Sequence, residues 1–463
     1  MEEDLDLLST RDDGETAVVD GRVGNLSVAE LRALREEWRQ RLRADRKVLV
    51  EIARPRSLDG LGAYLAALSL GHAVLLVDGA PPGLASSSRE AFRPDVSVNN
   101  GAVTWLPWAK ARTSDLLLHP ALAMVVSTSG SVGAAKAVRL SYDNLSANAR
   151  SIAEATGIRP EERAATSLPA DYAFGLSIIN SYLISNGVLA LTESPPTSRG
   201  FWWQLDQLGA SAVGLLPTTC RLLLARGWSP RSHPSLERVL IAGGRLDPPE
   251  ARVIADLMRS VNGLVNIMYG QAEATARISV LDTTSALTHP GSVGRVVPGG
   301  RVEILAEEET PVRDGERGEI VYRGPNVMLG YATARTDLGL GDVHRGRLRT
   351  GDLGYLSNGF LYLTGRVDRQ VKILGRRIQL DQMEGQLRSA LDTEVMVIPL
   401  SEEMIAVCHE GGVSVSVTPV VERVAGRWGL PRACLRVREM PLPRLHSGKL
   451  DYRGISLQLA GIG

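Results

Sequence analysis

From about residue 47 to residue 270 the sequence alternates short apolar segments with amphipathic ones, and this alternation limits the folds open to the chain. The apolar segments have the length of buried strands, and the amphipathic segments between them have the period of surface helices. Strands are expected at 47–53, 73–77, 124–126, 164–168, 188–191, 212–216, 239–242 and 264–268. One helix is expected to begin near Asp143 as its N-cap, and another to run from Leu176 until Gly187 ends it. Alternating strands and helices predict parallel sheets covered by helices.

Beyond residue 290 the pattern changes to short, glycine-punctuated segments of strand character. These segments, at 301–305, 318–322 and 359–364, predict a β subdomain. A chain of 463 residues is too long for one ordinary core, so more than one domain is expected. We predict an α/β protein with a large N-terminal domain of helix-covered sheets plus the β subdomain, residues 1–367, and a small α+β C-terminal lid, residues 368–463.

Composition narrows the classes of function. With 44% hydrophobic and 22% charged residues the chain resembles a soluble globular protein. No apolar run approaches the roughly 18 residues of a membrane span, and the acidic segment Met1–Asp6 is unlike a basic targeting peptide, so a cytoplasmic protein is expected. Basic and acidic residues number 52 each and form no blocks of like charge. Nucleic acid and membrane surfaces are therefore poor candidate partners, and small-molecule chemistry is favoured.

Cysteine and lysine are both rare. The cysteines match no disulfide or zinc spacing and are expected to be buried apolar residues: Cys220, Cys408 and Cys434. Only five of the 52 basic residues are lysine. A lysine is a compact, rotatable point charge, a role that guanidinium fills poorly. Three of the five lysines fall inside glycine-containing motifs: Lys136, Lys372 and Lys449.

The first motif, Ser127 to Lys136, directly follows an apolar strand. Gly130 and Gly133 allow a tight loop in which backbone amides, hydroxyl groups and the lysine can face phosphate oxygens. The hydroxyl groups belong to Ser127, Thr128, Ser129 and Ser131. The loop is not a Walker A motif, because that motif has its lysine directly after the last glycine and a Ser or Thr after the lysine. Taken alone, the segment is equally consistent with a flexible surface loop.

The second motif, Tyr269 to Glu273, stands at the end of an apolar strand. Ligands of open α/β sheets bind at the carboxyl ends of strands. At that place Tyr269 can stack on a base and Glu273 can hold a metal ion. In isolation, a purely structural turn is the more common explanation of such a segment.

The third motif combines Arg349–Asp352 with Gly365–Asp368. Asp352 can accept hydrogen bonds from both hydroxyls of a ribose, and Arg366 can reach a phosphate or the ribose. A hairpin with solvated charges is the alternative. The fourth motif, Leu442 to Lys449, places a lysine on a glycine-containing loop, where its charge can reach a phosphate. A solvated tail lysine is the alternative there.

In this order, the four motifs resemble those of the adenylate-forming superfamily, which includes acyl-CoA and aryl-CoA synthetases, adenylation domains of non-ribosomal peptide synthetases and firefly luciferase. The resemblance covers roughly residue 121 to the C-terminus, and the preceding part fits the same fold. It implies activation of a carboxylic acid by ATP and Mg²⁺ to an acyl-adenylate, with release of pyrophosphate. Transfer of the acyl group to a thiol would follow.

The resemblance also assigns the nucleotide-binding residues by position. Ser127–Lys136 resembles the phosphate loop of the family. Gly243 and Gly244 resemble the segment that lies against adenine and the acyl substrate. Tyr269 resembles the aromatic residue that stacks on adenine, and Gly270 follows it.

The remaining core residues carry the implied mechanism. Glu273 resembles the magnesium ligand, and Asp352, with Arg366 beside it, resembles the aspartate that binds the ribose. A carboxylate oxygen would attack the α-phosphate in line while pyrophosphate leaves. Mg²⁺ and Lys449 would stabilise the charge that builds on the phosphoryl oxygens. No general base is needed, because a carboxylate is already ionised near neutral pH.

The C-terminal residues resemble the mobile lid of the family. Asp368 matches the hinge, and Lys449 matches the catalytic lysine. The lid would swing about the hinge after adenylation, which removes the lysine and presents another face for thioester formation. Lys372 and Gly375 lie in the segment that would flank the acceptor tunnel.

Two departures from the family pattern concern the phosphate contacts. Val132 stands where a hydroxyl residue is usual, and Ala272 replaces the threonine that usually precedes the glutamate. These changes affect the expected rate and leave the expected fold unchanged. A degenerate nucleotide-binding homologue is one alternative, but the retention of Lys449, Glu273 and Asp352 argues against it.

The acyl pocket is expected around Asp171, Tyr172, Phe174 and Gly175. Tyr172 stands where CoA ligases of the family carry a histidine. Asp171 lies one place early for the residue that anchors the amino group in amino-acid-activating domains. The favoured interpretation is that the two aromatic residues pack the pocket wall.

The acceptor is left open between several nucleophiles. The sequence has no recognisable fused carrier module, so the thiol would belong to CoA or to the phosphopantetheine of a free-standing carrier protein. The alternative is a ligase that forms an amide or another nitrogen bond, as some members of the family do in secondary metabolism. Only the acceptor profile separates these two activities.

Overall fold

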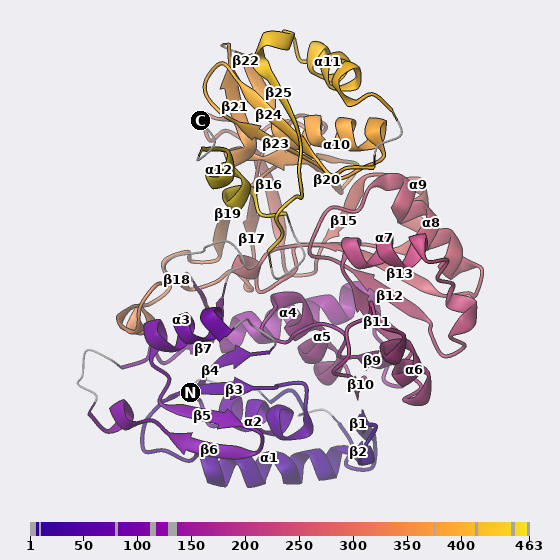
Figure 1. The fold of residues 1–463 in the computed structure, drawn as a ribbon. Coiled ribbons are helices and arrows are strands. Elements are labelled where there is room, and N and C mark those ends of the chain that lie inside the picture. Colours follow the sequence, from indigo (N-terminus) through magenta and orange to yellow (C-terminus); the bar gives the residue numbers. More distant parts are fainter. Residues whose placement is uncertain are drawn as a thin grey trace. The chain divides into compact units, whose positions relative to one another are not determined.

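The computed structural model describes residues 6–8, 11–78, 82–111, 117–127, 137–374, 376–412, 415–445 and 450–460. The chain forms two compact units, which are described separately (Figure 1). Unit 1 comprises Met1–Val302, Tyr322–Leu348 and Gly359–Leu361. Unit 2 comprises Glu303–Val321, Arg349–Asn358 and Tyr362–Gly463.

The first sheet of unit 1 has the strand order β18-β8-β7-β4-β3-β5-β6. Its strands are β3 (Leu49–Ala53), β4 (Ala73–Val77), β5 (Val96–Asn99), β6 (Ala102–Trp105), β7 (Leu122–Ser127), β8 (Ala137–Ser141) and β18 (Gly330–Ala332). The central pairs β5-β3, β3-β4 and β4-β7 are parallel, as the alternating pattern predicts. The helices of this region are α1 (Val28–Leu42), α2 (Leu58–Ser69) and α3 (Pro82–Phe92). Helix α2 packs on β3 and β4 and is covered in turn by α1.

The second sheet of unit 1 has the order β15-β14-β13-β12-β11-β9-β10-β1-β2. Its strands are β1 (Thr16–Asp20), β2 (Gly24–Ser27), β9 (Arg163–Ala165), β10 (Val188–Leu191), β11 (Ala212–Leu215), β12 (Arg238–Ile241), β13 (Leu264–Tyr269), β14 (Ser279–Leu281) and β15 (Ser292–Val296). The run from β1 through β10, β9, β11 and β12 to β13 is parallel.

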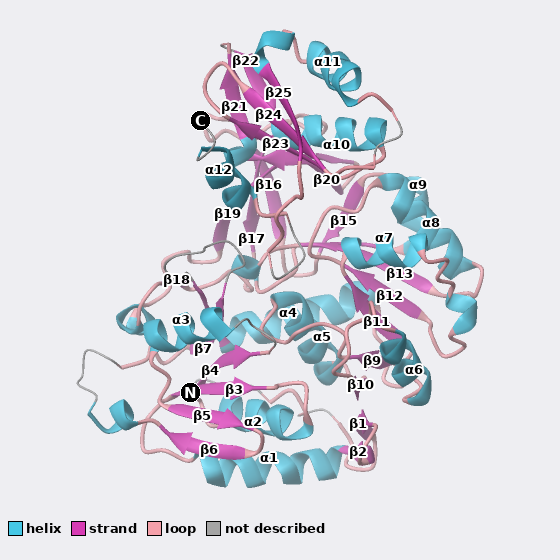
Figure 2. Ribbon diagram, in the orientation of Figure 1, coloured by secondary structure: helices cyan, strands magenta, loops and turns pink. Residues whose placement is uncertain are grey.

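Two helices form a layer between these sheets: α4 (Tyr142–Thr156) and α5 (Ala173–Ile184) (Figures 1 and 2). Helix α4 packs on β7 and β8, α5 packs on β9 and β10, and the two helices pack on each other. The remaining helices of unit 1 are α6 (Arg199–Gln207), α7 (Pro217–Ala225), α8 (Pro248–Arg259) and α9 (Thr283–Thr288). Because α5 is covered on both sides, nearly all of its residues are buried, including Phe174 and Ser177.

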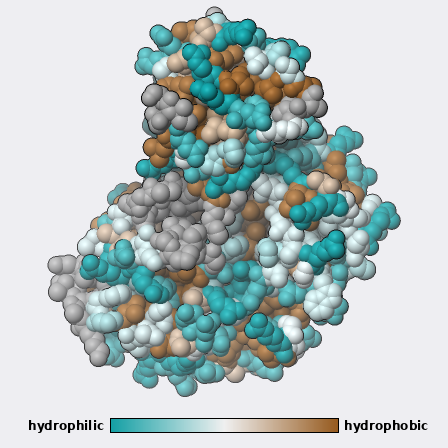
Figure 3. Space-filling view, viewed as in Figure 1, coloured by the Kyte–Doolittle hydropathy of each residue, from teal (hydrophilic) through white to brown (hydrophobic). Residues whose placement is uncertain are grey.

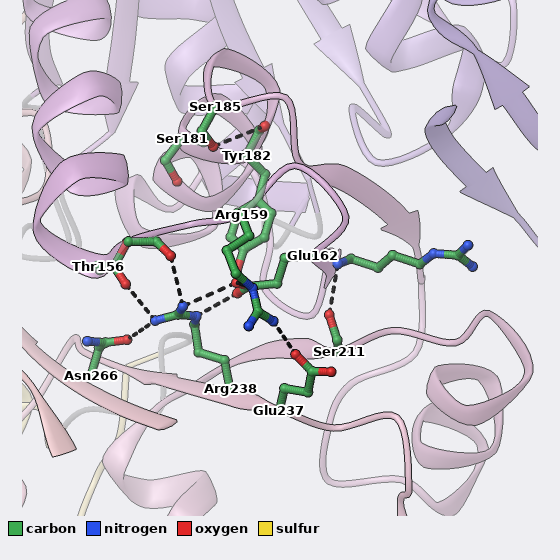
Figure 4. Close-up of polar contacts among 12 residues, drawn as sticks. Thr156, Arg159, Glu162, Ser181, Tyr182, Ser185, Ser211, Glu237, Arg238 and Asn266 are labelled. Carbon is green, nitrogen blue, oxygen red and sulfur yellow. Dashed lines mark hydrogen bonds and ion pairs between the residues drawn. The ribbon is translucent and has the colours of Figure 1, made fainter. Parts of the chain in front are cut away.

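A buried ion pair joins β12 of the second sheet to the segment between α4 and β9 (Figure 4). Arg238 Nε lies 2.5 Å from Glu162 Oε1, and both side chains are almost fully buried. Arg238 also donates to the Asn266 side chain and to the Thr156 carbonyl, while the Tyr182 hydroxyl donates to Glu162. A buried charge is tolerated when it is paired and hydrogen-bonded in this way.

Unit 2 contains most of the predicted β subdomain and the whole C-terminal segment. Its strands, of which the first four each have two residues in unit 1, are β16 (Arg301–Leu305), β17 (Gly318–Arg323), β19 (Arg347–Ser357), β20 (Phe360–Arg366), β21 (Gln370–Ile373), β22 (Arg376–Gln379), β23 (Val395–Pro399), β24 (Ile405–His409) and β25 (Leu435–Glu439). Its helices are α10 (Leu380–Leu391), α11 (Val417–Arg427) and α12 (Tyr452–Ala460). Short 3-10 turns occur in both units at Pro107–Ala111, Pro230–Ser232, Ala272–Ala274, Arg335–Gly339, Val367–Arg369 and Arg432–Cys434.

The sheet β23-β24-β25 of unit 2 is covered on both faces. Val395 and Val397 join a core cluster with α10 and α11. Met396 and Ile398 join a different cluster, which includes Ile455 of α12. This alternation is the period of two expected of a strand that is buried on both sides.

The structure confirms the α/β class and the positions of the predicted strands. The predicted helix boundaries are wrong by a few residues. Helix α4 begins at Tyr142 with Ser141 as its N-cap, because the Ser141 hydroxyl accepts from the amide of Asn144. The predicted cap, Asp143, instead lies in the first turn. Helix α5 begins at Ala173 and ends at Ile184, earlier on both sides than expected.

Further expectations concern burial and the domain boundary. All three cysteines are buried and free, as predicted. None of the described helices has both the length and the apolarity to cross a bilayer, and hydrophilic and apolar residues intermingle on the face shown in Figure 3. Asp368, the predicted hinge, lies within unit 2, and the boundary there stays a prediction.

Candidate active site

Glu273 lies in the 3-10 turn Ala272–Ala274, directly after the parallel strand β13 of unit 1. Its Oε1 accepts a hydrogen bond of 2.8 Å from the hydroxyl of Tyr331, a residue of β18 in the other sheet. Its backbone carbonyl accepts from the amide of Met328. The carboxylate is therefore held at the carboxyl end of a strand, where α/β sheets bind their ligands.

The turn that carries Glu273 is clamped by Asn326, whose exposure is only 2%. Asn326 Nδ2 donates to the carbonyls of Ala274 and Arg277 at 2.7 and 2.9 Å. The Thr275 hydroxyl donates to the Asn326 carbonyl at 2.6 Å. Thr275 and Ala276 adopt positive φ angles of 53° and 110°, which is a strained backbone for residues with a Cβ. The backbone preferences of Thr275 and Ala276 disfavour this turn. The hydrogen bonds of Asn326 satisfy its polar groups and so stabilise it.

Glycine is required at position 270. A Cβ there would lie 1.9 Å from the carbonyl oxygen of Ala276, which is backbone and cannot rotate away. The neighbouring Tyr269 is buried, with 8% exposure. Tyr269, Gly270 and Glu273 thus belong to one tightly packed turn.

Gly243 and Tyr172 are brought together by the fold. Gly243 follows β12 and has a φ of +87°. A Cβ built on it would lie 2.2 Å from the hydroxyl oxygen of Tyr172, the residue that precedes α5. At Gly244 a Cβ would meet only Pro217, at 3.6 Å. The predicted pocket residue Tyr172 therefore lies against the first of the two glycines.

The other predicted pocket residues occupy the segment before α5 and its first turn. Phe174 is buried, and the Arg277 guanidinium lies 4.4 Å from the centre of its ring. A Cβ at Gly175 would lie 2.1 Å from the carbonyl oxygen of Pro169, so no larger residue fits. Phe174 packs the interior of unit 1, and its place in the wall of an acyl pocket stays a prediction.

Asp171 belongs to a second polar cluster. Its Oδ2 accepts from the Asp78 amide at 3.0 Å, and the Asp78 carboxylate pairs with Arg56 at 2.5 Å. Burial, together with the negative charge of Asp78, raises the pKa of Asp171 to about 6. The carboxylate is therefore more readily protonated than an exposed aspartate.

In unit 2, Asp352 and Arg366 are neighbours, as the third motif predicts. Arg366 Nη1 lies 3.1 Å from Asp352 Oδ1, and Arg366 Nε lies at the same distance from Asp368 Oδ1. The Asp352 amide donates to the hydroxyl of Thr350. Lys372 is exposed in strand β21.

Several predicted site residues lie outside the described residues: Thr128, Ser129, Gly130, Ser131, Val132, Gly133, Lys136, Gly375 and Lys449. Ser127 is the last residue of β7, and its backbone pairs with Ala137. The strand thus leads into the predicted phosphate loop, and the roles of the loop residues and of Lys449 stay predictions.

Sequence reasoning missed three residues of the site: Tyr331, Asn326 and Arg277. The first two come from segments that no motif covers, and no local signal marks them. Arg277 does carry a signal, because it is a lone charge directly before the apolar residues that form β14. A charge at such a position is uncommon and warrants a search for its partner.

The residues present fit a magnesium ion. Mg²⁺ keeps several waters and is bound by one or two carboxylates together with substrate phosphates. Glu273 supplies one such carboxylate, at a strand end and fixed by Tyr331. Among the described residues, no group of three or more His, Cys, Asp or Glu side chains forms a metal site.

Comparison with known proteins gives concordant results. D-Alanine–D-alanyl carrier protein ligase from Bacillus licheniformis is 29% identical over 355 residues, which cover 71% of this chain and 69% of the ligase. ATP-bound MatB from Rhodopseudomonas palustris has a TM-score of 0.79 at 20% identity, over 99% of this chain and all of that one. O-succinylbenzoate coenzyme A synthetase (MenE) from Bacillus subtilis, in complex with AMP, has a TM-score of 0.78 at 20% identity, over 98% of both chains.

The two solved structures share the fold of this chain, which confirms the predicted architecture of helix-covered sheets. The enzyme class predicted from the motifs, an AMP-forming ligase, agrees with the ligases found. Residues 90–332, just over half of the sequence, match the family of AMP-binding enzymes. The chain belongs to the AMP-binding enzyme family.

Proposed function

We propose that the chain activates a carboxylic acid with ATP to an enzyme-held acyl-adenylate, releases pyrophosphate and then transfers the acyl group to a thiol. The observation that carries this proposal is the turn after β13. There Glu273 is fixed by Tyr331 in a chain of the AMP-binding enzyme family. The packing of Gly243 against Tyr172 supports an acyl pocket beside that turn.

In the first step a carboxylate oxygen forms a bond to the α-phosphorus, and the bond from that phosphorus to the pyrophosphate oxygen breaks. The carboxylate needs no base, because it is ionised near neutral pH. Mg²⁺, when bound, offsets the negative charge of the phosphates. Glu273 would hold the ion, Lys136 and Lys449 would approach the phosphoryl oxygens, and Asp352 with Arg366 would hold the ribose.

In the second step the thiolate sulfur attacks the acyl carbon, and AMP leaves with the electron pair of the broken acyl–phosphate bond. The identity of 29% to a carrier protein ligase supports a carrier phosphopantetheine as the acceptor. Coenzyme A presents the same phosphopantetheine thiol. A small-molecule acid and a free-standing carrier protein are therefore the proposed partners.

The test is acid-dependent exchange of labelled pyrophosphate into ATP, measured over panels of aliphatic, aryl, dicarboxylic and amino acids. Wild-type protein should show exchange with one class of acid. Glu273→Gln and Lys449→Ala should each lower it by about 100-fold or more, because each removes a charge that stabilises the phosphoryl transition state. Glu154→Gln, a change at an exposed residue of α4 outside the motifs, is the matched control. ATP binding without exchange for any acid would contradict the proposal.

The acceptor is tested separately on the same adenylate. Coenzyme A, a phosphopantetheinylated carrier protein and a primary amine are each added after adenylate formation, and the acyl product is identified by mass. A thioester supports the proposed transfer. Amide formation alone would instead assign the chain to the nitrogen-bond-forming ligases.

A further inference from the structure

Arg277 is a buried cation without an acidic partner. Its exposure is 3%, and no described carboxylate pairs with it. Nε contacts Met268 Sδ at 3.3 Å, Nη1 donates to the Ala276 carbonyl at 2.9 Å and Nη2 donates to the Ser177 hydroxyl at 3.1 Å. All three acceptors are neutral, so among the described residues the charge has no counter-charge and is offset only by these dipoles and by the Phe174 ring.

Other buried arginines of unit 1 have partners that offset their charge. Arg238 pairs with Glu162 (Figure 4), and Arg335 pairs with Asp95 at 2.9 Å. Arg139 forms no ion pair with a described residue, but four backbone carbonyls accept hydrogen bonds from it. Arg277 has no acidic partner among the described residues, and only one backbone carbonyl, two neutral side chains and the face of the Phe174 ring offset its charge. Burial without a counter-charge is unfavourable, and it lowers the pKa of Arg277 to about 10.

The surroundings of Arg277 are those of the proposed acyl pocket. Its guanidinium lies 4.4 Å from the centre of the Phe174 ring, and its charge lowers the pKa of Tyr172, which burial raises. Its backbone carbonyl is held by Asn326, in the same turn that carries Glu273. The cation is therefore fixed beside the predicted pocket residues and close in sequence to the proposed magnesium ligand.

A guanidinium has five N–H donors, two on each Nη and one on Nε. Described groups accept from one donor on each of the three nitrogens. The two remaining donors belong to Nη1 and Nη2, the pair that binds a carboxylate in a bidentate manner. Two donors that no described group uses and a charge without a counter-charge both favour a planar anion as the ligand.

We propose that Arg277 binds a second carboxylate of the acid that the enzyme activates, so that the substrates are dicarboxylic acids. This inference rests on the proposed adenylation and names its substrate class. One carboxylate of the substrate attacks the α-phosphate, and the other compensates the charge of Arg277. The acid also supplies the counter-charge that the folded chain lacks, so its binding stabilises the protein.

The experiment compares acids that differ only in the second carboxylate. Succinate is paired with butyrate, glutarate with pentanoate and terephthalate with 4-methylbenzoate, in pyrophosphate exchange with the full chain. We expect wild-type kcat/KM to favour the dicarboxylate of at least one pair by about 100-fold, the worth of a buried charged hydrogen-bond pair. In Arg277→Met that ratio should fall below one, and Arg277→Lys should retain part of it.

Thermal unfolding provides a readout that does not depend on activity. Arg277→Met removes a buried charge that has no described counter-charge and should raise the unfolding midpoint of the protein without substrate. Arg238→Met, the matched control, breaks a buried ion pair and should lower it. Succinate or glutarate, whichever is the better substrate, should raise the midpoint of wild type and leave Arg277→Met unchanged.

Each contrary outcome points to a different failure. No exchange with any acid would overturn the proposed adenylation itself. Exchange that favours monocarboxylates or amino acids in wild type would leave adenylation intact and overturn the role of Arg277. An equal loss for both members of each pair in Arg277→Met, with a lower unfolding midpoint, would mean that Arg277 serves the fold or the reacting carboxylate, and would also overturn it.

Discussion

At the scale of single residues, Asp171 shows how burial changes a carboxylate. Its pKa of about 6, against an ordinary 3.8, follows first from desolvation and then from the charge of Asp78, while Arg56 acts in the opposite sense. Between about pH 4 and pH 6 the folded chain holds a proton that the unfolded chain has released. Below about pH 4 Asp171 therefore does not destabilise the fold, and above about pH 6 it lowers the free energy of unfolding by its full amount.

Asp171→Asn should accordingly stabilise the fold at pH 8 and have little effect near pH 4. A shift of about two pKa units corresponds to roughly 2–3 kcal/mol in the free energy of unfolding. Urea unfolding at the two pH values measures the difference, and exposed Asp45 provides the control Asp45→Asn. A loss of stability at pH 8 would show that the hydrogen bond from the Asp78 amide requires the charged carboxylate.

The sequence predicted site residues where a motif is local. Tyr269, Gly270 and Glu273 lie in one turn, and the residue types alone suggest their chemistry. Their supports come from distant segments: Tyr331 is 58 residues from Glu273, and Asp78 is 93 residues from Asp171. Such partners follow from the packing of one sheet against another, which no spacing within a motif encodes.

At the scale of elements, the contact between Gly243 and Tyr172 fixes the end of β12 against the start of α5. Gly243→Ala should destabilise the protein by about 2–4 kcal/mol, because φ is +87° and the new Cβ would meet the Tyr172 hydroxyl. Removing that hydroxyl should relieve the collision with Tyr172, but neither the backbone strain nor the approach of the new Cβ to Leu216 Cδ2 at 2.9 Å. The double variant Gly243→Ala/Tyr172→Phe should therefore recover part of the loss.

Chemical denaturation of the four proteins in this cycle measures the coupling between the two positions. Gly244→Ala is the matched control, since its Cβ would make only an ordinary contact with Pro217. Strictly additive effects of the two changes would contradict the predicted collision.

Helices and strands could be predicted from the sequence where the apolar residues that become buried follow a simple repeating pattern. Continuous apolar runs gave the strands of both sheets, because parallel strands are covered on both faces. Helix α5 was placed a few residues late at its start. It lies between two sheets and is buried on all sides, so no polar face marks where it begins. The start of α4 depends on which of two nearby polar residues, Ser141 or Asp143, caps it, and Ser141 satisfies the free amide of Asn144.

At the scale of the whole molecule, the chain passes repeatedly between the two units. Residues 303–321 and 349–358 belong to unit 2, although residues of unit 1 follow each of them in the sequence. A prediction that divides the sequence into consecutive domains cannot describe a unit that is built from separate stretches of the chain. The α/β class was nevertheless predictable, because it depends on the order of strands and helices alone.

The predicted hinge lies between two anchored arginines of unit 2. Arg366 pairs with Asp352 of β19, and Arg369 pairs with Asp381 and Glu384 of α10. Between them stand only Val367 and Asp368, both exposed. Arg366 is also bonded to the segment after 368, because its amide donates to Asp381 Oδ2 and its carbonyl accepts from Gln379 Nε2. A rotation about Val367 and Asp368 would therefore have to break these two hydrogen bonds.

Asp368→Pro fixes φ near −65° and so opposes such a rotation, whereas Asp368→Ala removes the carboxylate and leaves φ free. If the lid moves between the two steps of the proposed reaction, Asp368→Pro should leave pyrophosphate exchange within about threefold of wild type and slow thioester formation by about tenfold or more. Asp368→Ala should affect both steps mildly and equally. Both are measured on the full chain, with the same acid and acceptor. Equal losses in Asp368→Pro would mean that the substitution distorts the fold, and a normal rate of thioester formation would place the pivot elsewhere or require no rotation at all.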